Sequence, residues 1–197
     1  MTWFVLLCVA IGVAVGLTGI LPTTHLDTVI MAILFLLVFA VGLDLGARGD
    51  AWKQVRSLGP RLIAVPFASA VGSITGVALM STYVWDYPWR IACALGSAFG
   101  WYSLSGPLLT HLAGPDIGAL AFLSDVTREL TALVLIPFVA RYIGNAEAVA
   151  LGGATSMDTT LPLLARASDG RATPLAFAHG LLIGLLVPVL IPLWFSI

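Results

Sequence analysis

The sequence predicts an all-α integral membrane protein with about seven membrane segments, two of them discontinuous or re-entrant helices. Of its 197 residues, 59% are hydrophobic and only 10% are charged, whereas soluble domains carry about 25% charged residues. Mean hydropathy is +1.03. Apolar stretches of about 20 residues, the length that a helix needs to cross the hydrocarbon, recur along the chain. These observations indicate that lipid is the solvent for much of the protein.

The candidate membrane segments follow one another with short connections and no linker. We therefore expect a single integral membrane domain over residues 1–197. The segments are residues 3–21, 28–46, 62–80, 91–113, 117–140, 149–165 and 172–195.

Charge and cysteine usage exclude several classes of protein. The formal net charge of −1 gives no reason to expect a nucleic-acid partner. Cys8 and Cys93 both lie inside apolar stretches, so we expect neither a disulfide framework nor a metal site, and no cofactor. No Lys or Arg precedes the first apolar stretch, which we therefore expect to be retained as a membrane helix. The positive-inside rule places the loop after the second segment in the cytoplasm; its basic residues are Arg48, Lys53, Arg56 and Arg61.

Two segments have poor helical sequences. "GSAFGWYSLSGPLLTHLAGP" (96–115) and "LGGATSMDTTLPLL" (151–164) each run from glycines through hydroxyl residues to a proline. Broken backbone at membrane depth requires protein or a water-filled cavity to satisfy its polar groups. A pair of interrupted segments in the two halves of a chain is the usual position of a transporter's binding site. The alternative for each segment taken alone is a kinked structural helix.

The segment 117–140 carries three charges near its middle: Asp125, Arg128 and Glu129. Each costs roughly 2.5–3.5 kcal/mol at the centre of a membrane helix. Asp125 and Glu129 are four residues apart and share a face, with Arg128 beside them. We expect Arg128 to be the structural partner that pairs with one acid. The second carboxylate must then find another cation, bind a proton or face water, as the coupling acid of a transporter would.

Three other polar residues in membrane segments are candidates, each with a structural alternative. Asp44 either faces the cavity or pairs at the surface with Arg48, four residues later. Asp158 lies in the second interrupted segment, where it could instead cap a helix. His179 either relays protons or acts as a hydrogen-bonding packing residue.

Several motifs also resemble the LysO family of bacterial L-lysine exporters. They are "LLVFAVGLDL" with the basic loop after it, "GWYSLSGPLLT", "SDVTREL", "GGATSMDTTLP" and "HGLLIGLLVP", in this order from about residue 30 to the C-terminus. The resemblance implies export of L-lysine across the bacterial inner membrane, with essential intramembrane acids that map onto Glu129 and Asp44. Members of the family carry further N-terminal spans. We therefore expect either a homo-oligomer such as a dimer, which GxxxG spacings such as Gly72/Gly76 would permit, or a separate small membrane subunit.

With lysine as substrate and protons as coupling ions, each candidate receives a role. Half-helix N-termini suit a carboxylate, and the hydroxyls expected to bind it are Ser103, Ser105, Thr155 and Ser156. Glu129, Asp125 and Asp158 would bind the ammonium groups. The residues assigned to proton coupling are Glu129, Asp125, Asp44 and His179.

Alternatives to lysine export remain open at this point. Another basic amino acid, such as ornithine or arginine, would suit the same charges. An intramembrane serine protease would use the serines of "SLSG" with His179, but such chemistry has no need of three charges within one membrane helix. A purely structural membrane subunit does not account for so many buried charges. We therefore expect a transporter and no enzymatic activity.

Overall fold

The computed structural model describes residues 58–85 and 87–197, together with positions 7, 11, 12, 14–18, 29, 32, 36 and 39, which are all helical. The chain divides into two compact units, residues 1–45 and 46–197. The expectation of one domain over 1–197 stays a prediction. Most of the expected segments 3–21 and 28–46, and Asp44 itself, lie outside the described residues.

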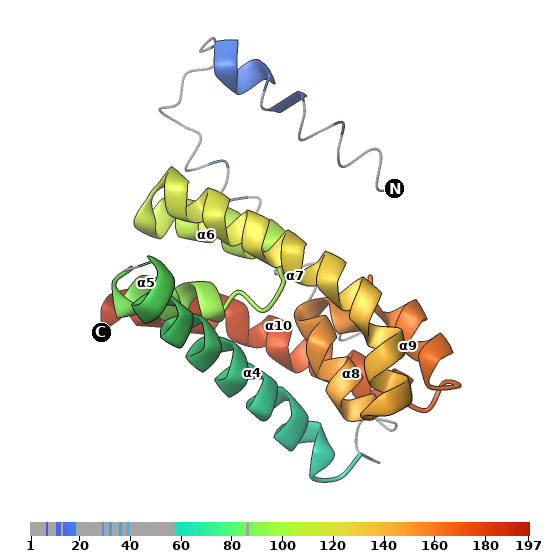
Figure 1. Cartoon of the computed structure of the whole chain (residues 1–197). Coiled ribbons are helices and arrows are strands. Elements are labelled where there is room, and N and C mark those ends of the chain that lie inside the picture. The colour runs from blue at the N-terminus through green and yellow to red at the C-terminus, as the bar shows by residue number, and fades with distance from the viewer. Residues whose placement is uncertain are drawn as a thin grey trace. The chain divides into compact units, whose positions relative to one another are not determined.

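The second unit is built of helices, and the part of it that the structure describes contains no strand, in agreement with the predicted all-α class (Figure 1). Several of the elements are short and follow one another without a loop. Their bounds are α4 Arg61–Met80, the π-helical turn η2 Ser81–Trp85, α5 Trp89–Gly96, α6 Tyr102–Ala113, α7 Pro115–Tyr142, α8 Asn145–Gly152, the 3₁₀ turn η3 Gly153–Met157, α9 Leu161–Ala167 and α10 Thr173–Ser196.

Three of the expected membrane segments are unbroken helices: 62–80 in α4, 117–140 in α7 and 172–195 in α10. Among the described residues, Arg61–Val84 and Thr173–Ser196 are long and apolar enough to cross a membrane. α7 has 28 residues, a length of about 42 Å at 1.5 Å per residue, but it carries the three charges. The count of about seven segments stays a prediction.

The other two segments are interrupted. Segment 91–113 contains α5 and α6, with residues 97–101 between them outside either helix. Segment 149–165 contains the end of α8, then η3, then α9. Glycine-rich sequence ends the first helix in both cases, since glycine reaches backbone angles that other residues rarely adopt.

α10 is the central helix of this unit and contacts α4, α5, α6, α8, α9 and η3 (Figure 1). Its GxxxG spacing allows the close approach: a Cβ at Gly180 would lie 2.8 Å from the Ala154 carbonyl oxygen, and one at Gly184 would lie 3.5 Å from the Met157 methyl carbon. The C-terminal end of α10 is bonded to α5, since the Trp194 Nε1–H donates to Ser97 Oγ over 2.9 Å.

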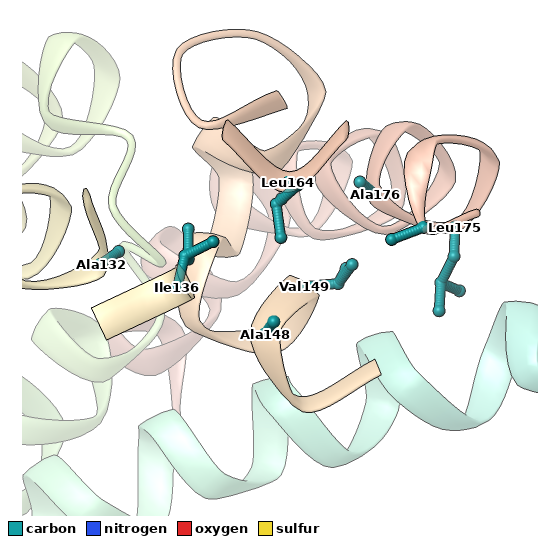
Figure 2. Close-up of a cluster of buried hydrophobic side chains, with 8 residues drawn as sticks. Ala132, Ile136, Ala148, Val149, Leu164, Leu175 and Ala176 are labelled. Atoms are coloured by element: carbon teal, nitrogen blue, oxygen red, sulfur yellow. The ribbon is translucent and has the colours of Figure 1, made fainter. Parts of the chain in front are cut away.

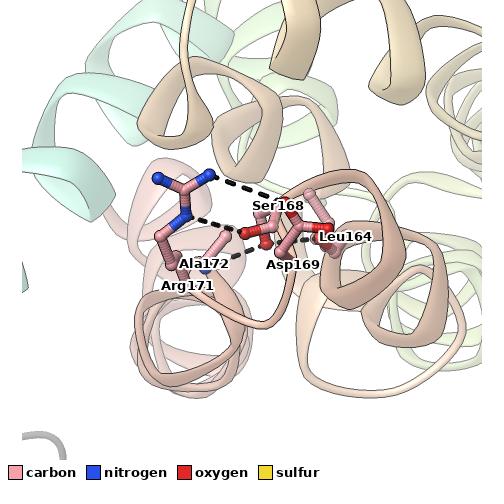
Figure 3. A network of polar contacts seen from close by, with 5 residues as sticks. All are labelled: Leu164, Ser168, Asp169, Arg171 and Ala172. Carbon is pink, nitrogen blue, oxygen red and sulfur yellow. Dashed lines mark hydrogen bonds and ion pairs between the residues drawn. The ribbon is translucent and has the colours of Figure 1, made fainter.

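An apolar core holds the second half of α7 against α8, α9 and the start of α10 (Figure 2). Its buried members are Ala132, Ile136, Ala148, Val149, Leu164, Ala172, Leu175 and Ala176. Between membrane helices such packing stabilises mainly through van der Waals contacts, since lipid is as apolar as the side chains themselves. Ser168 lies in the turn between α9 and α10. Its hydroxyl donates to the Leu164 carbonyl over 2.7 Å and accepts from the Ala172 N–H over 3.0 Å (Figure 3). This packing therefore sets the positions of the second half of α7 and of α8 and α9, the helices on either side of the second interruption.

Candidate functional site

The first interruption is held by a carboxylate from α7. Phe99 and Gly100 have positive φ angles of 52° and 89°, which turn the chain between α5 and α6. Asp125, only 4% exposed, accepts a hydrogen bond of 2.9 Å from the Gly100 N–H and one of 2.6 Å from the Ser105 hydroxyl. Both donors lie at the start of α6, where free amides and the helix dipole favour a negative charge. Asp125 is therefore the anion at this half-helix N-terminus.

The second interruption is bonded directly to the first. The Ala154 N–H donates to the Phe99 carbonyl over 2.9 Å. Gly153, with φ +57°, allows this approach, because a Cβ there would clash with the same carbonyl oxygen. We call residues 97–101 and 153–160, joined by this bond, the crossing. The two segments expected to flank the charged helix thus meet beside it.

Arg128 extends from α7 along the crossing. Cβ atoms built on the two turning glycines would lie 3.8 Å from its Cδ at Gly100 and 3.0 Å from its Nη2 at Gly153. Its Nη1 donates to Ser73 Oγ of α4 over 3.3 Å, and that hydroxyl donates to the Gly96 carbonyl over 2.8 Å.

The direct pairing expected between Arg128 and an acid of its own helix is not formed. In the described ranges 58–85 and 87–197, the ion pair within 4.0 Å is Arg171–Asp169, at the turn before α10. Asp125 uses both oxygens on the start of α6, so its attraction to Arg128 acts over a longer distance. Arg128 and Asp125 therefore hold different parts of the crossing.

A second acidic group lies at the other side of α7. Glu129 is half-buried beside Thr159, and the exposed Asp158 is close enough to interact with it electrostatically. The Tyr102 hydroxyl also interacts with both acids. We call Glu129, Asp158, Tyr102 and Thr159 the acid cluster. Two carboxylates with no cation among these four residues make a site that favours a cationic ligand or a proton.

Ser156 and His179 form a buried polar contact behind the crossing. Both are 0% exposed. The Ser156 hydroxyl lies 2.8 Å from the Gly153 and Ala176 carbonyls and 3.1 Å from His179 Nδ1. A hydroxyl has a single hydrogen, so the tautomer of His179 decides which group donates in the contact with Ser156. His179 Nε2 has no hydrogen-bond partner within the described part of the chain.

The four hydroxyls expected to bind a carboxylate have different surroundings. Ser103 is exposed. The other three are buried: Ser105 bonds Asp125, Thr155 donates to the Gly152 carbonyl over 2.8 Å, and Ser156 bonds backbone and His179. Each of these bonds would have to be exchanged before the hydroxyl could bind a ligand. The serines of "SLSG" also lack the contact with His179 that a protease dyad requires, since in the described structure His179 bonds Ser156.

Sequence reasoning did not single out Ser73, Tyr102 or Thr159. Ser73 had a signal, because Ser69 and Ser73 are four residues apart on one face of an apolar helix. Tyr102 begins α6 directly after the first interruption, and Thr159 lies within the second, just before α9, so the position of each depends on where a helix restarts.

Comparison with known proteins identifies close relatives. The family model for the lysine exporter LysO matches residues 6–195. The chain is 43% identical over 183 residues to the lysine exporter LysO of Escherichia coli, an alignment that covers 93% of this chain and 60% of that protein. It is 34% identical over 159 residues to a protein of Haemophilus influenzae described as a candidate lysine exporter, covering 81% and 80% of the two chains. No solved structure matches the chain.

Proposed function

Because the chain belongs to the lysine exporter LysO family, we propose that it exports L-lysine across the bacterial inner membrane in exchange for protons. Its E. coli relative carries lysine export in its name, and this chain spans 60% of the length of that relative. About seven membrane segments, two of them interrupted, would carry the chain across the bilayer.

The observation that carries the proposal is the acid cluster at the crossing. Glu129 projects from a 28-residue helix beside the restart of α9, where Asp158 and Thr159 lie. A membrane protein retains such charges where a ligand or ion balances them. The side-chain ammonium of lysine is a ligand of the matching charge, and Glu129 with Asp158 would bind it. Asp125 holds the crossing in shape.

Exchange for protons follows from the energetics of export. Moving a monovalent cation out against 100 mV, inside negative, costs about 2.3 kcal/mol. Entry of one proton for each lysine cancels that cost, and entry of two would draw on the membrane potential. A carboxylate that binds either a proton or an ammonium group couples the two movements. We assign this role to Glu129, with Asp44 and His179 as further candidates on the proton route.

Counterflow of labelled lysine in proteoliposomes tests the proposal. The purified chain should accumulate labelled lysine when unlabelled lysine is inside, and an inward proton gradient should accelerate export. Ornithine and arginine as competitors establish the substrate range. A second set of vesicles, with any small membrane protein encoded beside the chain, tests for the expected subunit. Lack of lysine-specific counterflow in both sets would contradict the proposal.

A further inference from the structure

A groove of about 590 Å³ lies between α4, α7 and α8, and Arg128 lines it. The α4 wall consists of small residues, among them Gly72, Ser73 and Gly76. A Cβ added at Gly72 or Gly76 would meet nothing within 4 Å. The GxxxG spacing of α4 therefore borders open space in this unit, unlike the packed spacing of α10.

The α7 wall of the groove is polar. Ser124, Thr127, Arg128 and Thr131 line it, at the spacing of one helix face. The neighbouring exposed face of the same helix is apolar: Leu123, Leu130 and Val134 are 61%, 59% and 63% exposed. Lipid selects apolar side chains on a membrane helix, and polar ones face protein or water. The leucine face therefore meets lipid, whereas the face with the hydroxyls and Arg128 lines the groove.

Arg128 lines this groove as its cation. It is half-buried, and among the described residues its guanidinium makes one hydrogen bond, the long contact of 3.3 Å to Ser73. A guanidinium presents five N–H donors in a planar fork that matches a carboxylate. The groove also contains Glu147, but its carboxylate folds over Gly144 at the first turn of α8, where an acid stabilises the helix start.

We propose that the groove binds the carboxylate end of an amino acid through the Arg128 guanidinium, with the Ser73 hydroxyl beside it. The inference rests on the proposed function in taking lysine as that amino acid. Successive residues of a helix point about 100° apart, so Arg128 faces the groove while Glu129 faces the acid cluster. The carboxylate site is then separate from the acid cluster, and the two sites lie about 100° apart around one helix. The α-ammonium stays beside the carboxylate, so only the side-chain ammonium of the same lysine would reach the acid cluster.

Three ligands separate carboxylate binding from ammonium binding. L-lysine has both kinds of group, norleucine lacks the side-chain ammonium, and cadaverine lacks the carboxylate. The reporter is Thr127→Cys, with both native cysteines replaced by serine. Among the described residues the Thr127 hydroxyl bonds its own helix at the Leu123 carbonyl, so it can be replaced. Leu130→Cys on the lipid face is the matched control.

A small thiol reagent should label Thr127→Cys in the groove and leave Leu130→Cys unlabelled, since thiolate forms only where water is present. Lysine and norleucine should each slow labelling at Thr127→Cys, by about tenfold at ten times Kd, and cadaverine should leave the rate unchanged. Adding Arg128→Gln to the reporter should remove this protection, and Arg128→Lys should retain part of it. Equal protection by cadaverine would overturn the inference.

The outcomes also separate this inference from the proposed function. If lysine drives counterflow but neither lysine nor norleucine protects Thr127→Cys, the carboxylate site is wrong and the function stands. If counterflow fails while norleucine protects and cadaverine does not, the carboxylate site stands and lysine export is wrong. If Arg128→Gln fails to fold, protection of Thr127→Cys by lysine, norleucine and cadaverine, measured with Arg128 intact, still tests whether the groove binds a carboxylate.

Discussion

The Phe99 carbonyl accepts a hydrogen bond of 2.9 Å from the Ala154 N–H, and this single bond joins two interrupted membrane segments that lie 55 residues apart in the chain. Both groups would otherwise be backbone polar groups without a helical partner at membrane depth, a situation that costs several kcal/mol for each group. Each interruption thus supplies a hydrogen-bond partner for one backbone polar group of the other.

Gly153→Ala should disrupt the crossing, because its methyl group would clash with the Phe99 carbonyl oxygen. Gly170→Ala is the matched control: Gly170 has φ +78°, but nothing lies within 4 Å of an added Cβ. The control should lose about 1–2 kcal/mol from the left-handed backbone alone, and Gly153→Ala should lose clearly more. Thermal unfolding in detergent measures both. Equal losses would show that the close approach at Gly153 is not needed.

Asp125→Ala should destabilise the protein by about 3 kcal/mol or more, since two hydrogen bonds to a charged group are lost and a buried N–H is left without a partner. Asp125→Asn should lose much less, because an amide can accept from Gly100 N–H and donate to the Ser105 hydroxyl. The exposed acid Asp116 at the first turn of α7 provides the control, and Asp116→Ala should cost about 0.3–1 kcal/mol. Denaturation of the three variants measures their free energies of unfolding and checks this ranking. If Asp125→Asn loses as much stability as Asp125→Ala, the negative charge of Asp125, and not its hydrogen bonds, stabilises the fold.

Glu129→Gln should fold normally and lose lysine transport driven by a proton gradient, because the amide keeps the shape but cannot exchange a proton for an ammonium group. Transport in proteoliposomes at a series of pH gradients measures this. Asp116→Asn removes a charge from the same helix outside the acid cluster and should transport as the unmodified chain does. Proton-driven transport that persists in Glu129→Gln would remove Glu129 from the coupling step.

Ser156→Ala should cost about 1–3 kcal/mol, because His179 Nδ1 loses its buried partner. Ser103→Ala should stay within about 0.5 kcal/mol, as expected for an exposed position. Thermal stability of the two serine variants compares a buried with an exposed hydroxyl from the same predicted set. Matching stabilities would mean that the Ser156–His179 contact contributes nothing to the fold.

Within the described residues, the sequence by itself determined which parts are helical and where two segments break. Apolar length predicted 117–140 and 172–195, close to the observed α7 and α10. Glycines followed by hydroxyls and proline predicted the interruptions inside 96–115 and 149–165, since these signals act on the local backbone. The three charges on α7 were equally evident, because a charged residue type is costly at membrane depth before any partner is known.

Only the tertiary structure decided what each charge contacts. Helix spacing favoured a direct pair between Arg128 and an acid on α7, yet Asp125 bonds Gly100, 25 residues away, and Arg128 bonds Ser73, 55 residues away. Spacing along one helix cannot predict Gly100 and Ser73 as partners. They come close to α7 only when the two interruptions cross and α4 packs on Gly96. A carboxylate then gains more from free amides at a half-helix N-terminus than from a neighbour on its own helix. The same packing leaves Arg128 facing the groove and Glu129 facing the acid cluster.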